Sequence, residues 1–348
     1  MKRIHLSKQI LPALTGLAIL SAQAGEPIDY TSSAKNVDVH NTLWDPHRVD
    51  SHAPISVMGE HTHEAGEWMV SYRYMSMEMG ENRDGTNTLA SQQLFNLGFP
   101  VATTEMTMEM HMMGLMYAPT DTVTLMAMTG YEFNKMDHVT RPGSPARMMR
   151  GETFKMATEG WGDTQFGALV KFHDANKRRA HLNLMMSAPT GNLTEKAYPM
   201  HTGTGTWDLL PGVTYLWQEG NISGGSQLTG RVHLGDNDLR FAYGDSVEGT
   251  SWLAYRLTDY LSVSGRLSLE HTADIDGVDA RLTAPFMAPP QDAANHGGTW
   301  AEAGLGLNVL VGGGNRVAFE AVMPFYQDLN GPQMERDVMF TAGWQKAF

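Results

Sequence analysis

The sequence predicts an all-β protein: a transmembrane antiparallel β-barrel of about 12 strands, with a short N-terminal periplasmic segment. Three observations favour this fold class. Apolar and polar residues alternate along many short segments, the connections between them are short and long in turn, and an export signal opens the chain. A barrel strand needs apolar residues only at every second position, because one face meets lipid and the other meets water.

The export signal comes first in the chain. Three basic residues precede an apolar run from Ile10 to Leu20, and small residues lead up to Ala24. This pattern is typical of a secretory signal cleaved after Ala24, and the run is shorter than the roughly 20 residues of a membrane-spanning helix. We therefore expect a signal peptide (1–24), a His-containing N-terminal segment (25–64) and an outer-membrane β-barrel (65–348).

Composition excludes several other classes. The chain has no cysteine, so disulfides and thiolate metal sites are excluded. A formal net charge of −13 argues against nucleic acid as a partner. Beyond the signal there is no apolar run near 18 residues, which excludes a helical membrane protein.

Alternation is clearest in residues 261–271, where Leu261, Val263 and Leu267 share one face and serines, an arginine and a glutamate share the other. The same pattern recurs in residues 161–172 and 317–325. It predicts strands near 66–79, 106–118, 122–132, 161–173, 180–188, 206–218, 222–235, 249–257, 261–272, 300–312, 315–325 and 337–348.

The connections between these strands also alternate. Short turns lie near 118–121, 219–221, 258–260 and 312–314, and long polar loops lie near 80–105, 133–160, 189–205, 236–248, 273–299 and 326–336. Outer-membrane barrels have short periplasmic turns and longer extracellular loops. We therefore expect both ends of the barrel chain to lie in the periplasm.

Charged residues share the face opposite the apolar one on many of these strands. A soluble β-sandwich would keep that inner face apolar, whereas a barrel with a wet interior would not. The predicted lumenal and transport residues are Arg73, Lys171, Arg231, Arg256, Arg266, Glu270, Glu302, Arg316 and Glu320. A closed barrel of this size has a narrow interior, so these side chains could also fill it.

At the C-terminus, Val338, Phe340, Ala342 and Trp344 alternate with other residues before a terminal Phe348. This resembles the signal by which the barrel-assembly machinery recognises its clients, although Lys346 departs from the usual apolar residue. The resemblance implies that machinery and outer-membrane lipids as partners.

Three short motifs occur in order along the chain: Gly160-Trp161-Gly162-Asp163 opening a strand, Ala188-Pro189-Thr190-Gly191 closing one, and Gly203-Thr204-Gly205-Thr206-Trp207-Asp208 opening another. From about Gly59 to Phe348 the chain resembles the outer-membrane transporter family of the phenol-degradation type. The stretch from Gly66-Glu67-Trp68 to Asn82-Arg83-Asp84-Gly85-Thr86 is similar to a Met-rich branch of it. The resemblance implies a barrel with a transport role and no catalytic residues.

Methionine is the most unusual feature, because twelve of the 25 methionines lie between Met69 and Met128. A lipid-facing Arg73 would cost roughly 2–4 kcal/mol at the membrane midplane. Arg73 and the alternate residues of its strand, which share its face, should therefore face the lumen. The candidate metal residues are Met75, Met77, Met79, Met106, Met108, Met110, Met112, Met126 and Met128, with His61 and His63 in the segment before the first strand.

Two interpretations of this methionine ladder remain open. Thioethers are soft ligands that suit Cu(I) or silver, so the ladder could conduct such ions. Methionine also makes an adaptable apolar wall, which would suit small hydrophobic or aromatic solutes. His61 and His63 form a His-x-His pair that can bind copper or zinc, but the sequence defines no third ligand.

No zinc-protease, phosphate-loop, nucleophile-elbow or dinucleotide motif occurs, so the sequence predicts a protein that is not an enzyme and has no cofactor. The predicted function is an outer-membrane transporter or channel for small solutes, with soft metal ions as one cargo. Uptake of small hydrophobic or aromatic compounds and a structural barrel that conducts nothing are the alternatives.

Overall fold

The computed structural model describes residues 44–194, 196–282 and 284–348. The predicted signal peptide and residues 25–43 lie outside this range. The described elements are η2 (Val49–Ser51), β1 (Trp68–Gly85), β2 (Asn87–Leu89), α1 (Ser91–Asn96), β3 (Val101–Tyr117), β4 (Val123–Thr140), α2 (Pro145–Arg150), β5 (Thr153–Trp161), β6 (Thr164–Ala175), β7 (Arg178–Ala188), η3 (Tyr198–Met200), β8 (Asp208–Glu219), β9 (Ile222–His233), β10 (Phe241–Ala242), β11 (Ser246–Arg256), β12 (Leu261–Thr272), β13 (Asp276–Gly277), η4 (Pro289–Gln291), β14 (Gly298–Gly312) and β15 (Asn315–Ala347).

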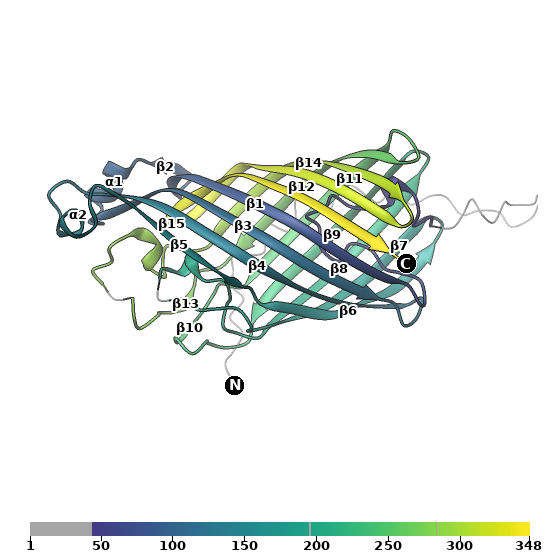
Figure 1. Cartoon of the computed structure of the whole chain (residues 1–348), viewed down its shortest axis with the longest axis horizontal. Helices are drawn as coiled ribbons and strands as arrows, with labels where there is room; N and C mark the ends of the chain where they lie inside the picture. Colours follow the sequence, from purple (N-terminus) through teal and green to yellow (C-terminus); the bar gives the residue numbers. More distant parts are fainter. Residues whose placement is uncertain (1–43, 195, 283) are drawn as a thin grey trace, which may run out of the picture. The chain divides into compact units, whose positions relative to one another are not determined.

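Within the described range, eleven strands close into one antiparallel barrel, which confirms the predicted fold class (Figure 1). The order around the ring is β1-β3-β4-β6-β7-β8-β9-β11-β12-β14-β15, and β15 pairs again with β1. β2 and β5 pair outside the ring with β1 and β4, and β10 and β13 form a separate two-stranded sheet. At the seam, the Trp68 and Phe348 backbones exchange two hydrogen bonds of 2.9 Å.

The last strand crosses the barrel twice. Residues 315–329 of β15 pair antiparallel with β14, and residues 329–347 pair antiparallel with β1. A ring whose neighbours are all antiparallel needs an even number of passes, so β15 must reverse its direction. The reversal lies near Gly331, whose φ of 75° favours glycine, and Gln327 bonds the backbone of Arg336 across it. Counted as passes, the ring therefore has the twelve that the sequence predicts.

Several predicted boundaries are wrong. The segment 326–336, predicted as a long loop, is paired as strand on both sides of the reversal near Gly331, so the connection is much shorter than predicted. β5 occupies part of the predicted loop 133–160. β1, β3 and β4 also run well past their predicted ends, with Val101 still paired to Thr140. These extensions are rich in polar residues, so the alternation that marks lipid contact stops although backbone pairing continues.

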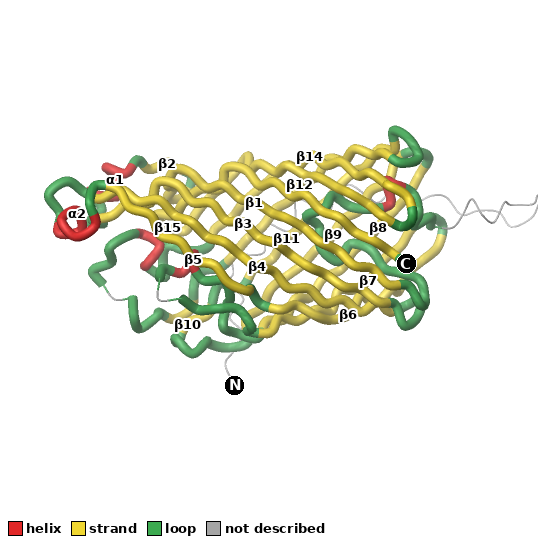
Figure 2. Tube along the Cα trace, in the orientation of Figure 1, coloured by secondary structure: helices red, strands yellow, loops and turns green. Residues whose placement is uncertain are grey.

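The connections divide between the two ends of the barrel. The short turns and the C-terminus lie at one end, and α1, α2, β5 and the β10–β13 sheet lie at the other (Figures 1 and 2). We call these the turn end and the loop end. This arrangement matches the predicted alternation of short and long connections.

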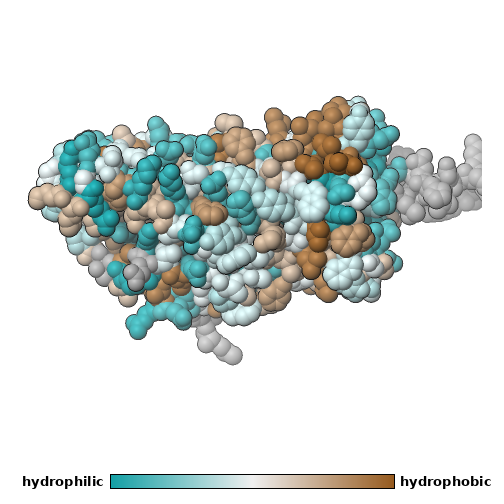
Figure 3. All heavy atoms as spheres, viewed as in Figure 1, coloured by the Kyte–Doolittle hydropathy of each residue, from teal (hydrophilic) through white to brown (hydrophobic). Residues whose placement is uncertain are grey.

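The outward face of the barrel is apolar over much of its height. Exposed hydrophobic side chains occur on most strands, among them Trp68, Tyr72, Leu125, Phe166, Leu184, Val213, Leu228, Leu253, Leu267, Leu305, Phe319, Met323 and Trp344. On the face shown in Figure 3, hydrophobic residues gather toward the turn end. Glu109 and His111 also point outward, but Tyr74 donates a hydrogen bond to Glu109, and the Tyr72 hydroxyl shares one with the His111 ring. No helix in the described range is long and apolar enough to cross a membrane.

Candidate functional site: the barrel lumen

Residues 44–64, here called the plug, lie inside the barrel. Their hydrogen-bond partners are inward-facing side chains on eight strands around the ring: Arg73, Thr124, His181, Asn183, Gln218, Ser223, Gln227, Ser262, Asn308, Arg316 and Glu320. A segment outside a closed ring could not reach all of these. We expected residues 25–64 to lie in the periplasm; the described part of that segment lies in the lumen instead.

The plug is held mainly through its backbone. Its regular structure, among the described residues, is the three-residue η2, so its carbonyl groups need partners elsewhere. Arg316 Nη2 donates to the Ala53 carbonyl at 2.7 Å, Arg73 Nε to that of Ile55 at 3.1 Å, and the His181 ring bonds that of Gly59 at 2.9 Å. Burial of these groups without partners would be unfavourable, so the sequence requires polar side chains on the lumenal face.

Four of the predicted lumenal charges form a buried network with the plug. Arg266 Nε donates to Glu320 Oε1 at 2.7 Å, and the other Glu320 oxygen accepts the Ser56 backbone N–H at 3.0 Å. Arg316 also donates to Asn308 and Gln345. Arg73 is the fourth member of this group and is 6% exposed. These charges serve plug docking, a role that the sequence did not suggest.

A second charged group lies nearer the loop end. Arg336 Nη1 donates to Glu270 at 2.8 Å and to Glu302 at 3.1 Å, and its guanidinium lies 4.3 Å from the centre of the Trp300 ring. The sequence identified both glutamates. It missed Arg336, because that residue falls in the segment predicted as a loop.

The remaining three predicted residues lie elsewhere on the wall. Arg231 pairs with Asp208 at 3.3 Å and lines the central cavity described below. Lys171 pairs with Asp174 at 2.8 Å, and Arg256 lies 3.9 Å from Asp259; both pairs are next to turns at the turn end. Lys171 and Arg256 are therefore rim residues.

The methionine ladder is inward-facing, as predicted. Across β1 and β3 the pairs are Met75 with Met110, Met77 with Met108 and Met79 with Met106, and Met112 lies opposite Arg73. Met126 and Met128 of β4 are 6% and 7% exposed. The ladder also recruits methionines that the sequence did not single out, on β7, β15, the plug and η3.

These methionines form two clusters. Near the turn end, Met69, Met116, Met126, Met128 and Met185 pack with Leu169, and Met58 of the plug joins them. Near the loop end, Met106, Met136, Met200 and Met334 form a second cluster, against which Met79, Met108 and Met156 pack. The second cluster brings η3 and the reversal of β15 into the mouth of the barrel.

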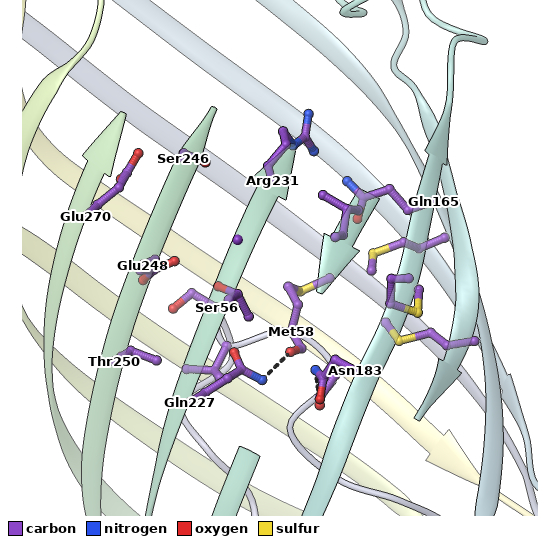
Figure 4. A pocket seen from close by; sticks show the side chains of 18 of the residues that line it. Ser56, Met58, Gln165, Asn183, Gln227, Arg231, Ser246, Glu248, Thr250 and Glu270 are labelled. Atoms are coloured by element: carbon purple, nitrogen blue, oxygen red, sulfur yellow. Dashed lines mark hydrogen bonds between the residues drawn. The ribbon is translucent and has the colours of Figure 1, made fainter. Parts of the chain in front are cut away.

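Several cavities remain between the plug, the wall and the loops. The central one has a volume of about 300 Å³, and a neighbouring one of about 190 Å³ shares Ser56, Glu248, Arg266 and Glu270 with it and contains Met75 and Met77. Figure 4 shows sulfur-bearing side chains on one side of the central cavity and Glu248 and Glu270 on the other. Such a cavity can accept a small solute with an apolar body and a polar group.

A third cavity of about 220 Å³ lies at the turn end and is lined by His52, His61 and His63 of the plug. Glu60 Oε1 lies 2.8 Å from His61 Nδ1 and 3.3 Å from His52 Nδ1. Burial and the nearby Arg316 lower the pKa of His52 to about 3, and burial and His61 lower the pKa of His63 to about 4. Burial opposes ionisation of Glu60, but His61 and His52 bring its pKa well below the usual value. At neutral pH His52 and His63 are therefore neutral and Glu60 is charged.

The loops at the loop end of the barrel pack together. Tyr198, Phe241, Ile275, Leu282 and Ala293 form a buried cluster, so the loops after β7, β9, β12 and the β10–β13 sheet pack on one another. Thr158 of β5 donates to the Met200 carbonyl and ties η3 to the wall.

The fold has a counterpart among solved β-barrel structures. It is similar to the crystal structure of the COG4313 outer membrane channel from Pseudomonas putida F1, with a TM-score of 0.60 at 13% identity, covering 84% of this chain and 99% of that one. Weaker likenesses are the transport unit of the autotransporter AIDA-I from Escherichia coli (TM-score 0.47, 10% identity, 84% and 93% covered) and the P. putida toluene transporter TodX (0.41, 9%, 82% and 91%). No family model and no curated protein matches the sequence.

Proposed function

We propose that the protein is an outer-membrane channel for small solutes with an apolar body, which pass along the methionine side of the lumen. The observation that carries this proposal is the central cavity: Met58, Met126, Met128 and Met185 line it together with Leu210, inside a barrel whose outer face is apolar. Thioethers have no fixed hydrogen-bonding need and can repack around solutes of different shape. Membership of the phenol-degradation family remains part of this proposal.

Two measurements test it. Intact cells that express the protein should accumulate a labelled phenol faster than cells with an empty vector, whereas a sugar of similar size should show little difference. The purified protein in a planar bilayer should show discrete conductance steps once the plug is displaced. Equal phenol uptake with and without the protein, and no conductance under any condition, would favour the structural barrel that conducts nothing.

Soft metal ions remain a second candidate cargo. The specific observation in favour is the loop-end cluster, where seven thioethers from β1, β3, β4, β5, β15 and η3 gather. Replacing Met106, Met108 and Met136 by leucine keeps the apolar volume but removes the lone pairs. Unchanged copper and silver tolerance in such a strain, at equal barrel abundance, would exclude this cargo.

For orientation, we propose that the turn end faces the periplasm and the loop end the outside. Gly143, in the exposed turn before α2, has a φ of 74° and accepts an inserted epitope without loss of buried contacts. Asn295 is a poorer site, because it is buried and donates to the Pro289 carbonyl. An epitope at Gly143 should be labelled on intact cells; labelling that requires permeabilised cells would reverse the topology.

A further inference from the structure

We propose that His52, Glu60 and His61 of the plug form a binding site for a divalent late transition metal ion of the Cu²⁺ or Zn²⁺ type. One ligand atom from each residue lies within 4.8 Å of the other two. A tetrahedral ion with bonds of roughly 2.0–2.1 Å holds its ligands about 3.3 Å apart, so small side-chain rotations bring all three into coordination. This site is independent of the channel proposed above.

Buried atoms without partners point to a ligand at this place. Glu60 Oε2, His61 Nε2 and His63 Nε2 are buried, and none has a hydrogen-bond partner among the described residues. Buried polar atoms in folded proteins are normally paired. A metal ion ligated by Glu60 Oε2 or by an imidazole Nε2 would give that atom the partner that it lacks.

The donor atoms determine the kind of metal. Two imidazoles and one carboxylate are nitrogen and oxygen ligands, which suit Zn²⁺ and Cu²⁺ better than the soft Cu(I) that thioethers select. The His63 ring lies 4.9 Å from that of His61, at an angle of 70°, and offers a fourth nitrogen. The site therefore differs in chemistry from the methionine ladder.

The third cavity gives the ion a route to the site. His52 and His61 line its wall together with Gly312, Gly314 and Ala347 at the turn end. Arg316 Nη1 lies 3.7 Å from Glu60 Oε1, and its positive charge opposes a cation at this place. We expect binding weaker than at a closed four-ligand site.

An ion at this place would join two points of the plug. His52 precedes, and Glu60 and His61 follow, the stretch 53–59 whose carbonyls bond Arg316, Arg73 and His181. Coordination would therefore fix both ends of the stretch that docks on the lumenal charges.

The test uses the purified full chain, folded in detergent and titrated with Cu²⁺ alone. We expect one equivalent bound, with a copper EPR spectrum that shows coupling to imidazole nitrogen, and displacement by excess Zn²⁺. His52→Ala and His61→Ala should each weaken binding at least tenfold, and Glu60→Gln, which keeps the shape of the side chain, should do the same. His173→Ala, at an exposed position of β6, is the matched control and should bind like the parent.

Heat-modifiable migration confirms that each variant is folded, and His52→Gln replaces His52→Ala if the latter does not fold. Copper affinity and EPR spectrum that are the same in the parent and in a His52/His61 double variant would overturn the proposal. Failure of the parent to bind Cu²⁺ would also overturn it. Neither outcome depends on solute uptake, so the result is separate from the test of the channel.

Discussion

The narrow barrel interior is filled in different ways along its two walls, one rich in methionine and the other in charged residues. On β1, β3 and β4 the inward side chains are mostly methionines, which pack on one another and on the plug. On β11, β12, β14 and β15 they include Glu248, Arg266, Glu302, Arg316 and Glu320, which need specific partners. A charged wall fixes the plug in one position, whereas a thioether wall can change its packing. We infer that plug docking depends on the charged wall and that solute passage depends on the methionine wall.

The largest expected effect comes from breaking the charged wall. Glu320→Ala removes the acceptor of Ser56 and leaves Arg266 with Glu248, 3.6 Å away, as its remaining carboxylate. Leaving a buried charge without its partner typically costs about 3–5 kcal/mol. We expect a clear drop in the temperature of heat modification and a rise in bilayer conductance as the plug loosens.

The matched control removes both charges. In Arg266→Met with Glu320→Met, both members of the buried pair are gone, and the carboxylate that loses Arg266 is Glu248, whose side chain is 40% exposed, so stability should recover toward that of the parent. The bond to Ser56 remains lost, so conductance should stay raised. If Glu320→Ala alone behaved like the parent in both measurements, the charged wall would not hold the plug.

The second prediction compares the contribution of side-chain volume with that of the sulfur atom in the methionine wall. Met106 is 1% exposed in the loop-end cluster. Met106→Ala leaves a cavity and should cost about 2–5 kcal/mol, whereas Met106→Leu should cost less than about 1.5 kcal/mol. Urea denaturation of the folded barrel measures both. Equal losses in the two variants would mean that the sulfur, not the volume, matters at this position.

Much of this contrast could be predicted from the sequence. The parity of Arg73 with its neighbours placed the methionines of β1 in the lumen, and alternation identified seven charged positions of the inner wall and two at its rim. The alternation of side chains between the two faces is a local property of a strand, so it can be predicted without knowledge of the fold. It failed at Arg336 and Met334, because the alternation stops where β15 rises beyond the apolar belt and reverses direction.

The plug could not be predicted in this way. Residues 44–64 have no period, and their burial depends on carbonyl groups that every sequence has. The sequence indicates a plug only indirectly. Many arginines and glutamates share the predicted lumenal face, and buried charges need partners, which a plug can supply. The histidines were visible in the sequence, but His52 and His61 are nine positions apart, and only the loop between them brings them together.

The smallest effect should come from the rim of the charged wall. Arg256 lies 3.9 Å from Asp259, whose side chain is 98% exposed. Arg256 also donates a hydrogen bond to Asn221, next to a turn. Exposed ion pairs are screened by water and contribute little. Arg256→Ala should leave both the heat-modification temperature and the conductance unchanged. A loss as large as that of Glu320→Ala would mean that the rim also holds the plug.

The central claim is that small apolar solutes pass along the methionine wall, and uptake by Met126 variants tests it most directly. Met126 is buried at the wall of the central cavity. Met126→Leu keeps that wall apolar, so labelled phenol should enter intact cells at the rate seen with the parent. Met126→Glu places a charge there and should reduce uptake at least tenfold, while Met148→Glu, at an exposed position of α2, should not. Equal uptake by Met126→Glu and the parent, at equal amounts of folded barrel, would contradict the account.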